Sequence, residues 1–300
     1  MSSHIQQLID RQLITNAPSF LSGAIQYEVV MGSVAYGVSS DSSDFDIYGF
    51  AIAPKDDVFP HLRGEVPGFD LCKPRFEHYQ EHHIIDASAL GGRGREYDVC
   101  VYAIAKYFRL LMENNPNIID SLFVPENCVL HCTPIGAMIR QRRQLFLHKG
   151  CWPKFKGYAY NQIKKTHTKA PLGKRKELVD KFGYDVKFAY HVVRLLNEVE
   201  QILIEQDLDL LRSREQLKAI RRGDWSLEQV EAFFNDKEKR LEQLYLQSEL
   251  PATADTDGIR QLLLDCLEQY YGNLTNAVAR QDQYGRAIDD IRQVLAKLDG

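Results

Sequence analysis

The feature that most constrains the fold is a change in the hydrophobic pattern about a third of the way along the chain. Runs rich in β-branched and aromatic residues predict strands at 25–31, 44–52, 83–87 and 96–101. From about residue 101, and almost everywhere after residue 133, apolar residues recur at helical spacing instead. The sequence therefore predicts an α+β fold with two domains: a mixed β-sheet with helices over 1–132, and an all-helical domain over 133–300.

Helices are predicted at 4–14, 134–148, 157–168, 177–206, 227–249, 259–272 and 284–298. Ser226 is followed three residues later by Gln229, a pair typical of the capping box that begins a helix.

The composition excludes several classes of protein. No apolar run approaches the roughly 18 residues of a membrane-spanning helix, and the N-terminus lacks a basic stretch followed by an apolar core. The six cysteines are spread over 300 residues, which is not the pattern of a disulfide-stapled domain. We therefore expect a cytoplasmic protein with no secretory signal.

Two aspartates on one predicted strand are the strongest candidates for chemistry. Asp44 and Asp46 are two residues apart, so a strand would point both carboxylates to the same face, with Phe45 and Ile47 turned to the core. Asp98, at the start of another predicted strand, could add a third carboxylate. Two like charges held so close repel each other, and a divalent cation would remove that cost. Hard oxygen ligands suit magnesium, and three carboxylates can hold two ions; manganese could take the same place.

A glycine-serine pair precedes these aspartates by ten residues. Gly32 would let a phosphate approach the backbone closely, and Ser33 would begin a helical turn that offers free N–H groups and a hydroxyl. This half of the site is expected to bind a phosphate.

The combination resembles a known superfamily. Gly32-Ser33, followed by Asp44-Phe45-Asp46, resembles the glycine-serine and aspartate-x-aspartate signature of the DNA polymerase beta-type nucleotidyltransferases. The longer run over 31–50 resembles a branch of predicted bacterial and phage nucleotidyltransferases associated with RNA repair. Residues 115–123 are similar to the helix-ending segment of that branch, and 184–196 to its helical-domain motif.

The resemblance implies a nucleotidyltransferase-type sheet and a role for each matched residue. The metal ligands and catalytic carboxylates would be Asp44, Asp46 and Asp98, and the phosphates of the NTP would bind at Gly32 and Ser33.

A second group of nucleotide ligands is predicted on the helix at 177–206. Lys187, His191 and Arg194 are spaced i, i+4 and i+7, which places them on one helix face. Three donors in a row suit a triphosphate, and His191 could also donate a proton to the departing pyrophosphate. A solvent-exposed basic stripe is the alternative interpretation.

Residues 127–176 hold twelve Lys or Arg and no Asp or Glu, although the whole chain has a net charge of −4. Aromatic residues, including Trp152 and Tyr160, are interleaved with these cations. Cations neutralise phosphates and aromatic rings stack on unpaired bases, so the block predicts binding of single-stranded or looped RNA such as tRNA. The predicted RNA contacts are Arg142, Arg143, Lys154, Lys156, Lys164 and Lys165. The alternative is that the aromatic residues belong to the core.

The sequence thus predicts a magnesium-dependent enzyme that transfers NMP from an NTP to an acceptor hydroxyl on RNA and releases pyrophosphate. Two rivals remain: nucleotidylation of a protein side chain, and a non-catalytic RNA-binding module on an inactive transferase fold. His78, His82 and His83 have ligand-like spacing but do not form a paired zinc pattern, so no zinc site is assigned to them.

Overall fold

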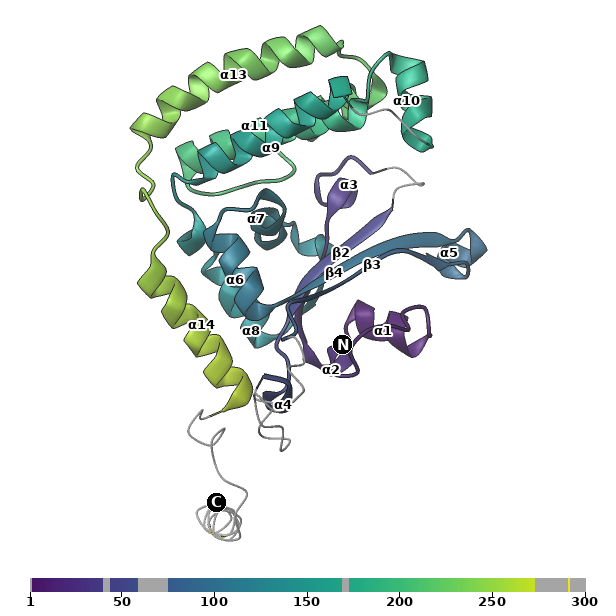
Figure 1. Cartoon of the computed structure of the whole chain (residues 1–300), viewed down its shortest axis with the longest axis vertical. Helices are drawn as coiled ribbons and strands as arrows, with labels where there is room; N and C mark the ends of the chain where they lie inside the picture. Colours follow the sequence, from purple (N-terminus) through teal and green to yellow (C-terminus); the bar gives the residue numbers. More distant parts are fainter. Residues whose placement is uncertain (1, 40–43, 59–74, 169–172, 273–290, 292–300) are drawn as a thin grey trace.

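The computed structural model describes residues 2–39, 44–58, 75–168, 173–272 and 291. Within them, one sheet contains β1 (Ile25–Val30), β2 (Phe45–Ala51), β3 (His78–Asp86), β4 (Arg95–Ala103) and β5 (Val129–Cys132). The strand order is β3-β4-β2-β1-β5 (Figure 1). β2 and β4 are parallel, whereas the β1–β2, β1–β5 and β3–β4 pairs are antiparallel. The mixed sheet with helices confirms the predicted α+β fold.

Helices cover both faces of the sheet and form most of the remaining chain. In chain order they are α1 (His4–Asp10), α2 (Leu21–Ala24), α3 (Gly32–Ala35), α4 (Lys55–Val58), α5 (Ala89–Gly92), α6 (Ile104–Met112), α7 (Pro116–Phe123), α8 (Pro134–Gln141), α9 (Cys151–Thr168), α10 (Lys174–Phe182), α11 (Val186–Glu205), α12 (Arg214–Arg222), α13 (Leu227–Gln247) and α14 (Thr256–Tyr271). Short 3₁₀ helices lie at Glu126–Cys128 and Arg143–Phe146. Figure 1 shows α9, α11 and α13 as neighbouring long helices, with α6, α7 and α8 beside the sheet and α1 and α2 across from them.

Two hydrophobic clusters hold the sheet between these helices. One face of β2 contributes Ile47 to a cluster with Ile5 and Leu8 of α1, all fully buried. The opposite face contributes Phe50 to a larger cluster that continues through α6, α7, α9 and α11. Because side chains alternate along a strand, Asp46 faces the side opposite Ile47, toward the helical part of the chain.

The helix predicted over 134–148 ends at Gln141 and is followed by the 3₁₀ helix Arg143–Phe146, and three further differences concern α10, α12 and β5. The single helix predicted over 177–206 is two helices, because Gly183 takes the left-handed conformation (φ +80°) that ends α10. Asp185 then caps α11 by accepting the backbone N–H of Lys187 at 2.9 Å. α12 was not predicted because it buries only Leu217 and Ile220 among charged residues. β5 was missed because four residues are too few to show a pattern.

Other predicted helices are found near their expected positions. The capping box at Ser226 is confirmed, with Gln229 N–H donating to Ser226 Oγ at 3.2 Å and Ser226 N–H donating to Gln229 Oε1 at 2.8 Å. The helix predicted at 284–298 lies outside the described residues apart from position 291. Among the described helices, none is both long and apolar enough to cross a membrane.

The domain boundary at 132/133 stays a prediction. β5 ends at Cys132 and α8 begins at Pro134, so the last strand and the first later helix meet at that point. The larger hydrophobic cluster nevertheless continues from the sheet into the later helices, which gives the two parts a shared core.

Candidate active site

The predicted carboxylates meet where β2 lies beside β4. The two strands are parallel, and their register places Asp46 directly beside Asp98, with Ile47 beside Val99 on the buried face. Asp44 immediately precedes β2, which begins at Phe45. Parallel strands in register point paired side chains to the same face. The predicted third carboxylate therefore lies next to Asp46.

The electrostatics of Asp46 are those of a crowded acidic site. Burial is the largest cause that raises its pKa, to about 6, and the Asp98 and Asp44 carboxylates raise it further. Lys187 acts in the opposite direction and lowers the pKa of Asp46. A divalent cation would relieve this cost, so the residues present fit a metal. In the described part of the chain, however, the trio whose ligand atoms lie within 4.8 Å of one another is His83, Glu96 and Asp98, not the three aspartates.

Gly32 is required by the close approach of the Asp46 side chain. It begins α3 one residue after the end of β1 and has φ +62°, and a Cβ at this position would lie 1.9 Å from Asp46 Oδ2. The backbone N–H of Met31 also donates to the carbonyl oxygen of Asp46 at 2.8 Å. The glycine therefore fixes the packing of the turn against the acidic site, a reason that the sequence argument about phosphate did not include. Ser33 follows it and is half-buried.

The Gly32→Ala substitution is expected to cost about 1–3 kcal/mol of stability and to displace the Asp46 carboxylate, which would reduce any activity of the site. The matched control is Gly23→Ala, because Gly23 lies in α2, has no positive φ and has no atom within 4 Å of a Cβ added there. Urea unfolding of both variants would measure the difference. Equal stability of the two would contradict the assigned role of Gly32.

The first two basic residues of the α11 face lie in a strongly positive environment. Lys187 is half-buried in the first turn of α11. Burial lowers the pKa of His191 well below its ordinary value, and the cations of Arg194, Arg175, Lys187 and Arg221 lower it further. His191 is therefore neutral at neutral pH in the ligand-free protein. Arg175 and Arg194 are themselves paired with the Asp185, Asp120 and Glu198 carboxylates, so Lys187 and Arg221 are the cations left to favour an anion beside His191.

Arg194 is a correction to the predicted set of phosphate ligands. Its side chain is only 5% exposed, and its guanidinium contacts both oxygens of Glu198 at 3.0 and 3.1 Å as well as the Asp120 carboxylate. It also donates to the Tyr36 hydroxyl at 2.7 Å. These partners are buried and all of them contact Nη1, so Arg194 joins α11 to α7 and to the residue after α3 inside the protein instead of facing a ligand.

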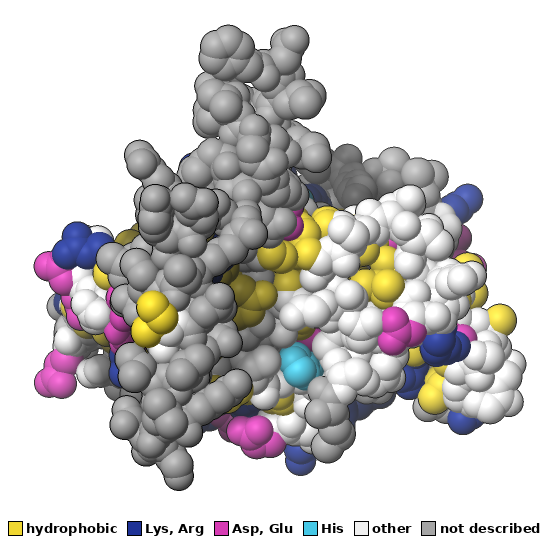
Figure 2. Space-filling model, turned by 90° about the horizontal axis from the view of Figure 1, so that it is seen from below, with side chains coloured by type: hydrophobic (Ala, Val, Ile, Leu, Met, Phe, Trp, Pro, Cys, Tyr) yellow, Lys and Arg dark blue, Asp and Glu magenta, His cyan; other side chains and the backbone are white. Residues whose placement is uncertain are grey.

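The basic block is not an unpaired positive surface. Acidic residues distant in sequence pair with its cations: Asp265 with Arg142, Asp207 with Arg143, Glu113 with Lys154, and both Glu238 and Glu242 with Lys156. Lys164 and Lys165 are exposed on α9, and the Lys165 ammonium lies 6.0 Å from the centre of the Phe188 ring. Figure 2 views the molecule from below, at the end away from α9 in Figure 1, and there acidic and basic side chains of the described residues are interspersed.

The aromatic residues of the block mostly belong to the core. Phe146 and Phe155 are fully buried and Trp152 is 3% exposed, whereas Tyr160 is 61% exposed. The stacking role predicted from the sequence is therefore open only to Tyr160 among these four. The alternative interpretation, that the aromatic residues belong to the core, holds for the other three.

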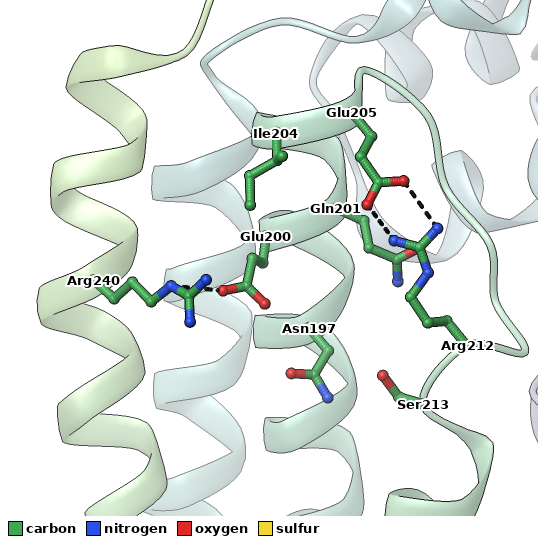
Figure 3. Close-up of a pocket in the computed structure, with 8 residues that line it drawn as sticks. All are labelled: Asn197, Glu200, Gln201, Ile204, Glu205, Arg212, Ser213 and Arg240. Carbon is green, nitrogen blue, oxygen red and sulfur yellow. Dashed lines mark hydrogen bonds and ion pairs between the residues drawn. The ribbon is translucent and has the colours of Figure 1, made fainter.

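A separate pocket of about 130 Å³ lies near the other end of α11, against α13 and the segment before α12 (Figure 3). Its charges are already paired: Arg212 contacts Glu205, and Arg240 Nε lies 3.0 Å from Glu200. Thirteen residues of helix separate Lys187 from Glu200, about 20 Å along the axis. The pocket is therefore distinct from the acidic site and offers no unpaired ionic group among the residues that line it.

Sequence reasoning missed several residues near the site. Arg175 and Arg221 reach His191 from α10 and α12, and Glu96 lies two residues before Asp98 on β4. Arg175 belongs to the basic block but had no distinguishing signal within it. Nothing in the sequence links Arg221 to α11, since the contact depends on how α12 packs.

Comparison with known proteins shows which family the chain belongs to. No curated protein matches the chain at a significant level. A crystal structure of a nucleotidyltransferase-like protein from Exiguobacterium sibiricum 255-15 is similar, with 9% identity, a TM-score of 0.28, and coverage of 92% of this chain and 81% of that one. A family model described as RNA repair pathway DNA polymerase beta family (RlaP) matches residues 1–284, which confirms the resemblance found in the sequence, and the chain belongs to this family.

Proposed function

We propose that the protein is a magnesium-dependent nucleotidyltransferase that transfers NMP from an NTP to a hydroxyl of RNA and releases pyrophosphate. The observation that carries the proposal is the pairing of Asp46 with Asp98 on parallel strands, with Asp44 beside them and the Gly32 turn packed against Asp46. The family description supports the RNA-related role.

In this proposal Asp44, Asp46 and Asp98 hold the metal. The high pKa of Asp46 reflects the cost of keeping these carboxylates charged together, and it supports their assignment to a cation. When bound, magnesium supplies charge neutralisation at the reacting oxygens. The residues of the chain otherwise bind and orient: Lys187 neutralises the triphosphate beside the carboxylates, and the Ser33 hydroxyl and turn bind its phosphates.

His191 would donate a neutral N–H to the triphosphate. Its low pKa makes it a poor proton donor before the nucleotide binds. Arrival of a polyanion among these cations favours protonation, so the predicted role in protonating pyrophosphate would depend on bound nucleotide.

The proposed RNA surface is the exposed face of α9 together with Arg142 and Arg143, which precede this helix in the chain. Exposed ion pairs such as Arg142–Asp265 contribute little to stability, so an RNA phosphate can replace the carboxylate at small cost. Lys164 and Lys165 extend this surface along α9.

Replacing Lys164 and Lys165 by glutamine is expected to weaken RNA binding and to lower the slope of log K against log salt by about 1.4, because each single-strand phosphate contact contributes about 0.7. The matched control is the pair Lys218→Gln and Lys239→Gln, two lysines on α12 and α13. RNA titrations at several salt concentrations would measure the slopes. If both double variants had the wild-type slope, α9 would not be the RNA surface.

The proposal is tested by incubating the protein with each labelled NTP, magnesium and total RNA. Labelling of RNA by the wild type, and its loss when Asp46 is replaced, would support the proposal. Label on protein would instead support the nucleotidylation of a side chain. Tight RNA binding without any label would support a non-catalytic module.

A further inference from the structure

A β-bulge brings two adjacent histidines to the edge of the acidic site. In the β3–β4 ladder Glu81 pairs with Val99 and Ile84 pairs with Tyr97, so His82 and His83 share the space opposite Asp98. His83 has φ +59°, the left-handed conformation seen in such bulges. In a regular strand neighbouring side chains point to opposite faces. Here the bulge lets both histidines reach carboxylates of β4.

The contacts of these histidines converge on Asp98 and Glu96. His82 Nδ1 lies 3.2 Å from Asp98 Oδ2, and the backbone N–H of His83 donates to Asp98 Oδ1 at 2.9 Å. His83 Nδ1 contacts Glu96 Oε1. Potential ligand atoms of His83, Glu96 and Asp98 all lie within 4.8 Å of one another.

We propose that His83, Glu96 and Asp98 form a binding site for a divalent transition ion such as zinc, and that His82 holds the Asp98 carboxylate beside it. An imidazole nitrogen with carboxylate oxygens is a donor set suited to zinc, whereas magnesium prefers oxygen alone. Zinc bonds of about 2.0–2.2 Å require ligand atoms roughly 3–4 Å apart. The observed spacing needs only small side-chain rotations, and the His83 side chain, 80% exposed, is free to make them.

A simple ion pair between His83 and Glu96 would account for only part of this arrangement. It leaves unexplained why His82 contacts Asp98 from the same bulge, because one pair needs neither the second histidine nor the second carboxylate.

The site shares Asp98 with the proposed catalytic centre. A transition ion bound by His83 and Glu96 would draw the Asp98 carboxylate away from Asp46, so zinc would inhibit magnesium-dependent transfer. This consequence rests on the proposed function, but the binding of zinc does not.

The binding test uses the full chain carrying Asp46→Asn. This substitution weakens the proposed catalytic centre as a competing zinc site. Calorimetric titration with zinc chloride is expected to show one equivalent bound. Adding His83→Asn should weaken binding at least tenfold, since asparagine tolerates the left-handed backbone but is a poor zinc ligand. Adding His78→Asn should leave it unchanged, because His78 stacks on Tyr102 at the other end of β3.

Glu96→Gln in the same background provides a second variant if His83→Asn does not fold, as judged by circular dichroism, and it should weaken zinc binding similarly. Absence of zinc binding to Asp46→Asn, or equal binding to the His83 and His78 variants, would overturn the proposal.

Inhibition is measured separately in the protein with Asp46 intact, as the fraction of each variant's own zinc-free labelling rate that remains with zinc. The wild type and His78→Asn should be inhibited, and His83→Asn should resist. If zinc binds as expected but no NTP is ever transferred, the proposed function fails while the metal site stands.

Discussion

Replacing Asp46 with asparagine is expected to reduce nucleotidyl transfer by on the order of 10³-fold, because it removes a charged ligand from the centre of the proposed site. The same change is expected to stabilise the metal-free protein by about 1 kcal/mol after screening by solvent. The raised pKa of Asp46 means that its ionised form is disfavoured in the folded state. Transfer to labelled RNA and thermal unfolding without metal would measure the two effects.

The stability gained in Asp46→Asn should depend on pH, because the pKa of Asp46 is raised in the folded state. The folded-state pKa of about 6 lies above the ordinary value of 3.8, so the aspartate costs stability above pH 6 and costs nothing below about pH 4. The gain in Asp46→Asn should therefore appear near neutral pH and disappear in acid. Magnesium should raise the melting temperature of the wild type more than that of the variant.

Asp257→Asn is the matched control for the same chemical change. Asp257 is 85% exposed in the first turn of α14, where it pairs with Arg260 at 2.8 Å. This variant should keep wild-type transfer and lose little stability. If Asp46→Asn kept full transfer, the metal assignment would be wrong, and so would the proposed function.

The acidic site could be predicted largely because its residues are close in sequence. Asp46 lies on β2 and Asp44 immediately precedes this strand, so their nearness follows from the chain without any knowledge of the fold. Asp98 was a weaker prediction, since its position depends on β4 pairing in register with β2. The histidines of β3 could not be placed, because the bulge that turns them toward Asp98 is not visible in the sequence.

The basic block shows what the sequence alone could not reveal about its ion pairs. Residues 127–176 contain no acid, yet Lys156 meets Glu238 and Glu242 from α13, more than 80 residues later. The charge of a segment therefore did not predict the charge of the surface it forms. The predicted role of Arg194 as a phosphate ligand was wrong for a related reason. Helical spacing shows on which face of a helix a residue lies, but not which residues pack against that face. Seven residues beyond Lys187 is about 10 Å along α11, far enough to pass from the site to a buried contact.

The Arg194→Met substitution is expected to destabilise the protein by about 3–5 kcal/mol, the largest stability loss predicted for this chain. Arg194 is the cation between two buried carboxylates: Asp120 is fully buried and Glu198 is 3% exposed. Removing it leaves both without an opposite charge. Burial already raises the pKa of each carboxyl, and the guanidinium opposes that rise. Urea unfolding at several pH values would measure the loss.

The loss should grow as the pH is raised from about 5 to about 8. In the variant the folded-state pKa of these carboxyls lies further above the unfolded value, so the stability that they contribute when protonated is lost as the pH increases. Two further variants separate charge from packing. Arg212→Met removes an exposed partner of Glu205 and should cost less than about 1 kcal/mol. Combining Arg194→Met with Asp120→Asn and Glu198→Gln should recover much of the stability, because no buried charge then remains unpaired. If Arg194→Met unfolded at the same urea concentration as Arg212→Met, the guanidinium would be free to bind a ligand and the original interpretation of Arg194 as a phosphate contact would return.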